Sequence, residues 1–212
     1  STLTAAILGA SAAASADNLA IGFADPLSSL DPQLNNHAGD RSVALHFWDL
    51  LIENKWNKLQ PGLAVSWKPL DNTTWEFKLR EGVKWQDGTP FTADDLIYSY
   101  TRARAVPGSV ATYAGYLRTI DTMTAKDPLT LIVKTKAPNP DLPLNLASIH
   151  VVSKHVGEKS STEDYNSGKA MVGTGPYKFV SYTPGDRVLM ERNDAYWGDK
   201  QIWEKVNYRY IN

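Results

Sequence analysis

Four histidines are the residues of this chain best suited to metal binding or acid–base catalysis, and their spacing supports neither. They are His37, His46, His150 and His155. No two stand four positions apart, as ligands on one helix face would, and none lies in a His-Glu-x-x-His frame. A metal site is therefore not predicted. His37 and His150 lie in or beside expected loops, where binding residues concentrate.

Other catalytic patterns are also missing from the sequence. It has no cysteine, which removes thiolate nucleophiles and Cys-ligated metals, and no Gly-x-Ser-x-Gly nucleophile elbow. Asp94 and Asp95 are adjacent and would point in different directions on a helix, so capping explains them better than an acid–base pair. Gly173-Thr-Gly-Pro176 lacks the third glycine of a nucleotide loop and predicts a tight turn. We therefore predict a protein that is not an enzyme and binds no cofactor.

The composition favours the binding of a small solute. Seven tryptophans and ten tyrosines can line a pocket for sugars or peptides, although core-facing rings such as Trp75 are packing residues. Lys plus Arg (22) nearly balance Asp plus Glu (23), so the net charge is −1. Without a uniform basic field, nucleic acid is not an expected partner.

Hydrophobic periodicity predicts an α/β fold with a mixed sheet and interleaved helices. Helices are expected at residues 40–51 with Asp40 as N-cap, from residue 93, and at 110–120. A turn-rich loop, residues 24–32, follows the first strand, a common place for a ligand. The expected strands are residues 19–23, 74–80, 129–135, 149–152, 176–182, 187–192 and 206–211.

Residues 74–100 give the clearest local signals. Trp75, Phe77 and Leu79 alternate with charged residues, so the former should face a core and Glu76, Lys78 and Arg80 should face water. Thr92 and Asp95 have the spacing of a capping box, and Phe91 can pack on Leu96 as a hydrophobic staple. A helix is thus expected to begin at Ala93.

Residues 1–16 are small, apolar and uncharged and end in Ala14-Ser15-Ala16. This composition predicts the remnant of a secretory signal peptide with cleavage before Asp17, and a flexible Ala/Ser-rich linker is the alternative. The folded part is then expected to be residues 17–212.

One long stretch, residues 74–100 (TWEFKLREGVKWQDGTPFTADDLIYSY), resembles the signature of the family 5 extracellular solute-binding proteins of ABC importers, the oligopeptide, dipeptide and nickel-complex group. Further matches follow the family's order along the chain: Leu30-Asp-Pro32, Pro61-Gly-Leu-Ala-Val-Ser-Trp67, Gly173-Thr-Gly-Pro-Tyr177 and Arg192-Asn-Asp-Ala-Tyr-Trp-Gly198.

The resemblance implies a periplasmic protein of two lobes with the type II periplasmic-binding-protein fold, of which this chain is the N-terminal part of lobe one. Its partners would be a ligand, most simply a short peptide, an ABC permease in the inner membrane, and the second lobe of the same protein. Alternative solutes are an oligosaccharide, an opine-like compound or a chelated metal. A regulatory or adhesive surface protein that reuses the lobe is a different alternative, and a hydrolase is a more distant one.

The family's lobe-one ligand contacts lie in the loop after the first strand, at the start of the next helix, and after the signature helix. Carried onto this sequence, they suggest as ligand-binding residues Ser28, Ser29, Asn35, Asn36, His37, Arg41, Tyr113, Tyr116 and His150. The serines could equally stabilise a turn, and the two tyrosines could belong to the core.

Overall fold

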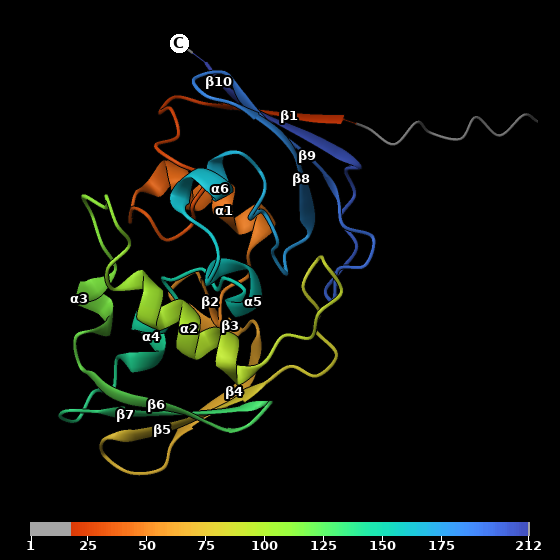
Figure 1. The fold of residues 1–212 in the computed structure, drawn as a ribbon. Coiled ribbons are helices and arrows are strands. Elements are labelled where there is room, and N and C mark those ends of the chain that lie inside the picture. Colours follow the sequence, from red (N-terminus) through yellow and green to blue (C-terminus); the bar gives the residue numbers. More distant parts are fainter. Residues whose placement is uncertain (1–17, 212) are drawn as a thin grey trace, which may run out of the picture.

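The computed structural model describes residues 18–211, and it has a four-stranded sheet at each end with most of the helices between them (Figure 1). The first sheet joins the two ends of the described chain, because its strands at residues 18–23 and 205–210 pair in parallel. The remaining strand pairs of this sheet are antiparallel. This confirms the expected mixed sheet. Its order is β1 (Asn18–Phe23), β10 (Lys205–Tyr210), β9 (Arg187–Arg192) and β8 (Tyr177–Thr183).

The second sheet is antiparallel throughout and is built from the middle of the chain. A separate hairpin of β2 (Ile52–Lys55) and β3 (Lys58–Pro61) lies between the two sheets. Strands β2, β3, β4 and β6 were not predicted from the sequence. The order in the second sheet is β4 (Ala64–Pro69), β5 (Thr74–Leu79), β7 (Thr130–Thr135) and β6 (Ile120–Asp127).

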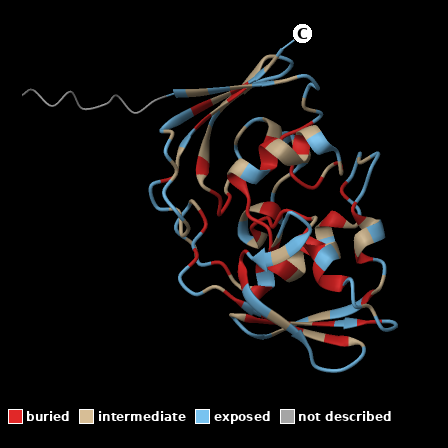
Figure 2. Cartoon of the chain, turned by 180° about the vertical axis from the view of Figure 1, so that it is seen from behind, coloured by how far each residue is buried: buried red, intermediate tan, exposed pale blue. Residues whose placement is uncertain are grey.

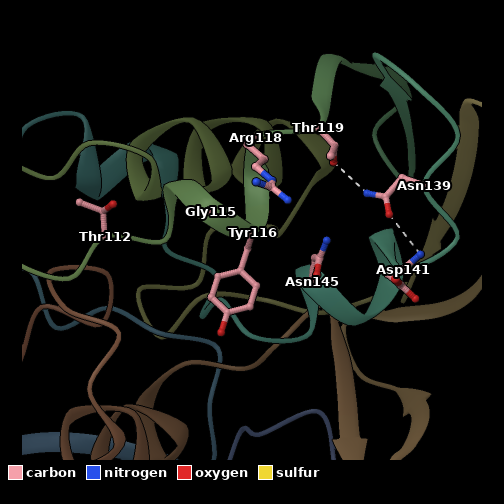
Figure 3. Close-up of a pocket in the computed structure, with 8 residues that line it drawn as sticks. All are labelled: Thr112, Gly115, Tyr116, Arg118, Thr119, Asn139, Asp141 and Asn145. Atoms are coloured by element: carbon pink, nitrogen blue, oxygen red, sulfur yellow. Dashed lines mark hydrogen bonds between the residues drawn. The ribbon is translucent and has the colours of Figure 1, made fainter.

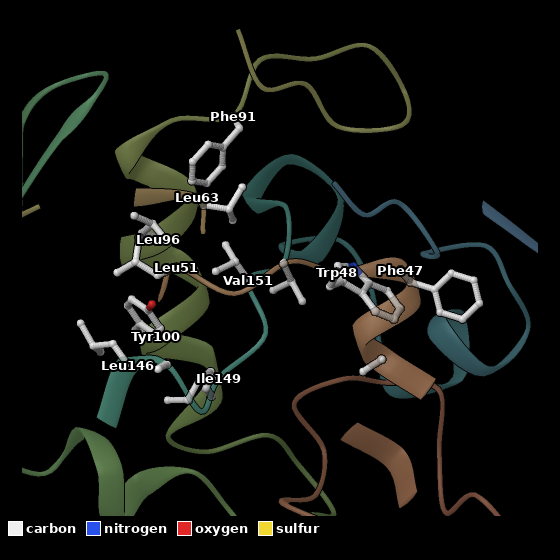
Figure 4. Packing of buried hydrophobic residues seen from close by; sticks show 14 of the residues in the cluster. Phe47, Trp48, Leu51, Leu63, Phe91, Leu96, Tyr100, Leu146, Ile149 and Val151 are labelled. Atoms are coloured by element: carbon white, nitrogen blue, oxygen red, sulfur yellow. The ribbon is translucent and has the colours of Figure 1, made fainter. Parts of the chain in front are cut away.

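The helices are short and share one hydrophobic core. Figure 4 shows Leu96 and Tyr100 of the second helix packed with Leu51 and Ile149. Within residues 18–211 no helix is both long and apolar enough to cross a bilayer. The helices are α1 (Ala38–Phe47), α2 (Ala93–Ala103), α3 (Ala114–Leu117), α4 (Leu142–Leu146), α5 (Lys154–Gly157) and α6 (Thr162–Asn166).

Helix α2 begins at Ala93, as the capping signals predict. The backbone N–H of Thr92 donates to the Asp95 carboxylate at 2.9 Å, which satisfies a backbone donor at the N-terminus of the helix. Asp95 also accepts from the indole of Trp85 and from the backbone N–H of Lys154. One carboxylate therefore joins three segments, and Asp95 is a structural residue.

Helix α1 differs from the prediction at both ends. Its N-cap is His37 and not Asp40, whose carboxylate lies in the first turn and accepts hydrogen bonds from Ser28. The helix ends at Phe47, four residues early, because Gly173 and Gly175 cross its C-terminus. The backbone N–H of Gly175 donates to the Phe47 carbonyl at 2.9 Å, which fills an acceptor that another helical turn would have used.

Two other predicted elements are much shorter than expected. Residues 110–120 contain only the four-residue α3, since the side chain of Asn35 accepts from the backbone N–H of Val110 and holds the segment in a loop. Residues 149–152 form no strand beyond one bridge, between Leu50 and His150. This apolar run is buried because it crosses the core, which hydrophobicity alone cannot distinguish from a strand. Residues 1–16 lie outside the described part of the chain.

The alternation of β5 predicted that Glu76 would face water, and this is wrong. Glu76 is only 7% exposed. It lies on the outer face of the second sheet beneath Lys68, Lys126 and Lys78, whose Nζ atoms are 3.7, 3.7 and 4.0 Å from its carboxylate oxygens. The stems of these lysines cover it, which period-two patterning does not reveal.

We predict that Gly173→Ala destabilises the fold by about 1–3 kcal/mol, because a methyl group there would lie 1.7 Å from the Phe47 carbonyl oxygen and force the backbone apart. Gly115→Ala is the matched control, since its added methyl group meets no atom within 4 Å. Urea denaturation of the two variants measures the difference. Equal stabilities would show that the crossing at Phe47 tolerates displacement.

Candidate functional site

A buried ion pair anchors the loop between β1 and α1, which carries most of the predicted site residues. Arg102 of α2 donates from Nη1 to Oδ1 of Asp31 at 2.9 Å and from Nη2 to Oδ2 at 2.5 Å. The Asp31 side chain is fully buried and that of Arg102 is 12% exposed. The Asp31 carboxylate also accepts from Thr162 and from the backbone N–H of Gln33. All of its acceptor capacity is thus used within the protein.

The same loop has two further anchors, of which the one at Gln33 is buried. The Gln33 amide donates to the Ser99 hydroxyl at 2.7 Å and to the His150 carbonyl at 2.9 Å. The Ser29 hydroxyl and the backbone N–H of Leu30 both donate to the side-chain oxygen of Asn166. These bonds fix the loop from beneath, so its outer residues are held in defined positions.

The loop and residues 109–116 lie side by side, which brings several predicted site residues together. The backbone N–H of Asn36 donates to the Ala111 carbonyl at 2.8 Å, and its side-chain amide donates to the Tyr116 hydroxyl at 3.3 Å. Tyr113 is fully buried, and its hydroxyl donates to the Asn35 carbonyl at 3.4 Å. Asn35 and Tyr113 therefore support the surface on which Asn36 and Tyr116 are partly exposed.

The start of α1 completes this surface. Arg41 is half-buried and donates from Nη1 to the Asn36 side-chain oxygen at 3.4 Å. His37 is exposed at the N-cap position. We call Asn36, His37, Arg41 and Tyr116 the polar cluster. Ser28 is exposed nearby, and its hydroxyl is committed to Asp40 and Asn35.

Ser29 and His150 are placed differently from the other predicted site residues. Ser29 is buried, and its hydroxyl donates to Asn166 and accepts from the backbone N–H of Asp31 at 3.0 Å, so it stabilises the local turn. His150 is only 1% exposed, with Nδ1 3.0 Å from the Trp48 carbonyl, although it borders a pocket that Arg41 also lines. Burial lowers the pKa of His150 to about 4, and the nearby Arg41 charge acts in the same direction, so the ring is neutral at neutral pH.

Two pockets flank the polar cluster. The first has a volume of about 400 Å³ and is lined mostly by residues with polar side chains, with Tyr116 and Thr112 on the side of the cluster and Asn139 and Asn145 opposite. Figure 3 shows the hydrogen bonds that hold this far wall, from Asn139 to Thr119 and from the Asp141 backbone to Asn139.

The second pocket has a volume of about 630 Å³ and lies between α1, β2 and the segment around His150. We call it the Arg41 pocket. Both volumes suit small-molecule ligands, which occupy pockets of about 300–1,000 Å³.

Asp49 is a residue of this region that the sequence analysis missed. Its carboxylate accepts from the Tyr196 hydroxyl at 3.0 Å and from the Trp197 indole at 2.8 Å, and burial raises its pKa. Tyr196 and Trp197 belong to the matched stretch Arg192–Gly198, which was the only available signal. Asp49 lines the Arg41 pocket with both oxygens already bonded.

Within residues 18–211 no three His, Cys, Asp or Glu side chains are grouped as metal ligands. The arrangement offers amide, hydroxyl, imidazole and guanidinium groups on an exposed surface, which suits reversible hydrogen bonding to a polar solute.

Solved structures define the class to which this fold belongs, that of the periplasmic binding proteins. The *Escherichia coli* murein tripeptide binding protein MppA superposes with a TM-score of 0.82 at 27% identity, over 92% of this chain and 42% of its own. The *Burkholderia pseudomallei* protein OppA gives a TM-score of 0.80 at 26% identity, over the same shares. The chain is therefore an incomplete periplasmic-binding-protein fold.

The chain belongs to the bacterial extracellular solute-binding proteins, family 5, whose described "Middle" region matches residues 58–212. It is 29% identical over 210 residues to the periplasmic oligopeptide-binding protein OppA of *Salmonella typhimurium*, covering 88% of this chain and 38% of the relative. OppA of *Haemophilus influenzae* is 31% identical over 82% of this chain and 36% of the relative. The chain thus spans somewhat over a third of the length of these relatives.

We predict that Arg102→Met destabilises the chain by about 3–5 kcal/mol, because it leaves the Asp31 carboxylate buried and unpaired. The double variant with Arg102→Met and Asp31→Asn should lose about 0.5–3 kcal/mol less stability than the sum of the losses in the two single variants. Arg187→Met, which removes one partner of Asp186 in a pair much more exposed than that of Arg102 and Asp31, should cost under about 1 kcal/mol. Strict additivity in the double-variant cycle would contradict the role of the pair as an anchor.

We predict that His150 makes the stability fall in acid. The unfolded chain protonates this ring near pH 6.5 and the folded chain only near pH 4, so its contribution is complete above pH 6.5 and is lost as the pH falls toward 4. The stability advantage of the wild type over His150→Gln should shrink by about 2 kcal/mol between pH 7 and pH 5. Urea unfolding at both pH values measures this, with the exposed His155→Gln as control. A constant advantage would refute the prediction.

Proposed function

We propose that this chain is part of the solute-binding component of an ABC importer, which binds a short peptide and delivers it to a membrane permease. The observation that carries the proposal is the polar cluster, which lies on and beside a loop that three side-chain anchors hold in place. Preorganised groups lose little conformational entropy when a ligand binds. The family of the chain makes a solute the expected occupant.

The chemistry of the polar cluster suits a peptide. An asparagine side chain both donates and accepts, as a peptide group does, and the tyrosine hydroxyl and imidazole offer further bonds. Several relatives carry names that state peptide binding, among them the murein peptide-binding protein MppA of *E. coli*. A *Helicobacter pylori* DppA structure, 25% identical, is described in complex with the peptide STSA.

Transport requires that ligand binding be converted into a shape that the permease recognises. In the proposed mechanism a second lobe of the full natural protein closes over the polar cluster, and ligand that touches both lobes stabilises the closed state. The periplasm is the proposed location, since the relatives are named periplasmic proteins.

We predict that residues 17–212 alone bind the cognate peptide at least about a thousandfold more weakly than the full natural protein. A cleft with only one wall lacks the ligand contacts that the other wall would make. A loss of about 4 kcal/mol of binding free energy turns micromolar into millimolar affinity. Calorimetric titration of both forms with the same peptide measures the ratio. Micromolar affinity of residues 17–212 would show that the second lobe is dispensable for binding.

The ligand class is tested by mass spectrometry of small molecules released from the full natural protein after mild denaturation. Short peptides are the expected result. A mannopinic acid complex of a 26%-identical structure, MoaA, shows that another solute class must be included in the search. Recovery of an opine-like compound, an oligosaccharide or a metal chelate, together with no calorimetric response to peptides, would overturn the peptide proposal.

A further inference from the structure

Arg41 is half-buried and has no acidic partner among residues 18–211. Arg80 and Arg104 share both properties, but of the three only Arg41 lines the Arg41 pocket. Arg102 is paired with Asp31, and Arg187 and Arg192 with Asp186 and Asp194. The only side-chain bond from the Arg41 guanidinium in the described chain is the one to Asn36, at 3.4 Å. Most of its five donors are therefore available to a ligand.

Helix α1 presents Arg41 to a space large enough for part of a ligand. Ala38, Arg41, Ser42 and Leu45 recur at helical spacing on one face of α1, and all four line the Arg41 pocket. Two of these neighbours are small, which leaves room beside the guanidinium. The opposite face of the helix, with Val43 and Phe47, is buried in the core, so the helix cannot rotate Arg41 away.

The acidic groups at the pocket are already occupied. Glu53 forms an ion pair with Lys55 on the same strand, β2. Asp49 has both carboxylate oxygens bonded, to Tyr196 and Trp197. The pKa of His150 is about 4, so its ring carries no charge at neutral pH. None of the acidic side chains that line the pocket therefore forms an ion pair with the Arg41 guanidinium.

Closure of a second lobe over this surface would remove water from Arg41. Burying an unpaired charge costs several kcal/mol, whereas a carboxylate can take two parallel hydrogen bonds from a guanidinium. We infer that the ligand carries a carboxylate that binds Arg41 in the Arg41 pocket. The inference rests on the proposed function and adds to it the chemical class of one end of the ligand. The carboxylate can be the peptide C-terminus or an acidic side chain.

The test compares charged and neutral peptide pairs on the full natural protein by calorimetry. One pair is Ala-Ala-Ala as free acid and as C-terminal amide, and the other is Ala-Glu-Ala-amide and Ala-Gln-Ala-amide. In the wild type, at least one pair should show about a tenfold or larger preference for the charged member. In Arg41→Met that preference should fall below about twofold.

Two further variants separate ligand binding from a merely structural role. Arg41→Lys keeps the positive charge but loses the planar guanidinium that can donate two parallel hydrogen bonds. It should therefore show a preference for the charged peptide that is intermediate between those of the wild type and Arg41→Met. Arg209→Met, on the exposed part of β10, should retain the wild-type preference. Thermal unfolding of each variant reports any loss of stability, which would lower affinity for both members of a pair alike.

The outcomes distinguish the inference from the proposed function. If peptides bind but charged and neutral members bind equally, or if Arg41→Met keeps the wild-type preference, the inference is overturned and peptide binding stands. If the wild type binds neither member of either pair, the proposed function is overturned and the inference falls with it. The pair whose preference disappears in Arg41→Met identifies the terminus or the side chain as the source of the carboxylate.

Discussion

The position of the polar cluster depends on one buried carboxylate, that of Asp31. Asp31 lies in the loop between β1 and α1, and it is paired with Arg102 of α2. Helix α2 packs against β6 and β7 of the second sheet. Thr162, at the start of α6, bonds the same group. One side chain thus joins the loop to two helices that are distant in sequence. Because a buried charge must be paired, these segments cannot separate without a large cost.

Close backbone contact is the second constraint on the architecture. Two glycines pass over the end of α1 at a distance that no side chain would allow, and one of them bonds its last carbonyl. This crossing ends α1 and starts the turn that leads into β8. The helix that presents Arg41 is therefore positioned at its C-terminus by the first sheet and at its N-terminus by the anchored loop (Figure 1).

Local signals predicted the elements that are determined locally. The capping box at Thr92, the alternation of β7 and the hairpin of β8 and β9 all follow from residues close in sequence. The errors occur where distant residues decide the outcome: Asn35 holds residues 110–113 in a loop, and three lysines from three strands bury Glu76. The candidate residues around Asn36 came from the family resemblance and stay a prediction, whereas Asp49 was not predicted because its partners are almost 150 residues away in the sequence. Figure 2 shows how buried and exposed residues alternate within single elements, which local patterning captures only in part.

The pairing of β1 with β10 has a consequence for the order of events during biosynthesis. Residues 18–23 have their strand partners at residues 205–210, so β1 cannot join its sheet until β10 has been synthesised. Contacts between residues so far apart in sequence form slowly, because the entropy cost of closing a long loop precedes the favourable free energy of the contacts. Strand β1 therefore has no sheet partner while residues 24–204 are being translated.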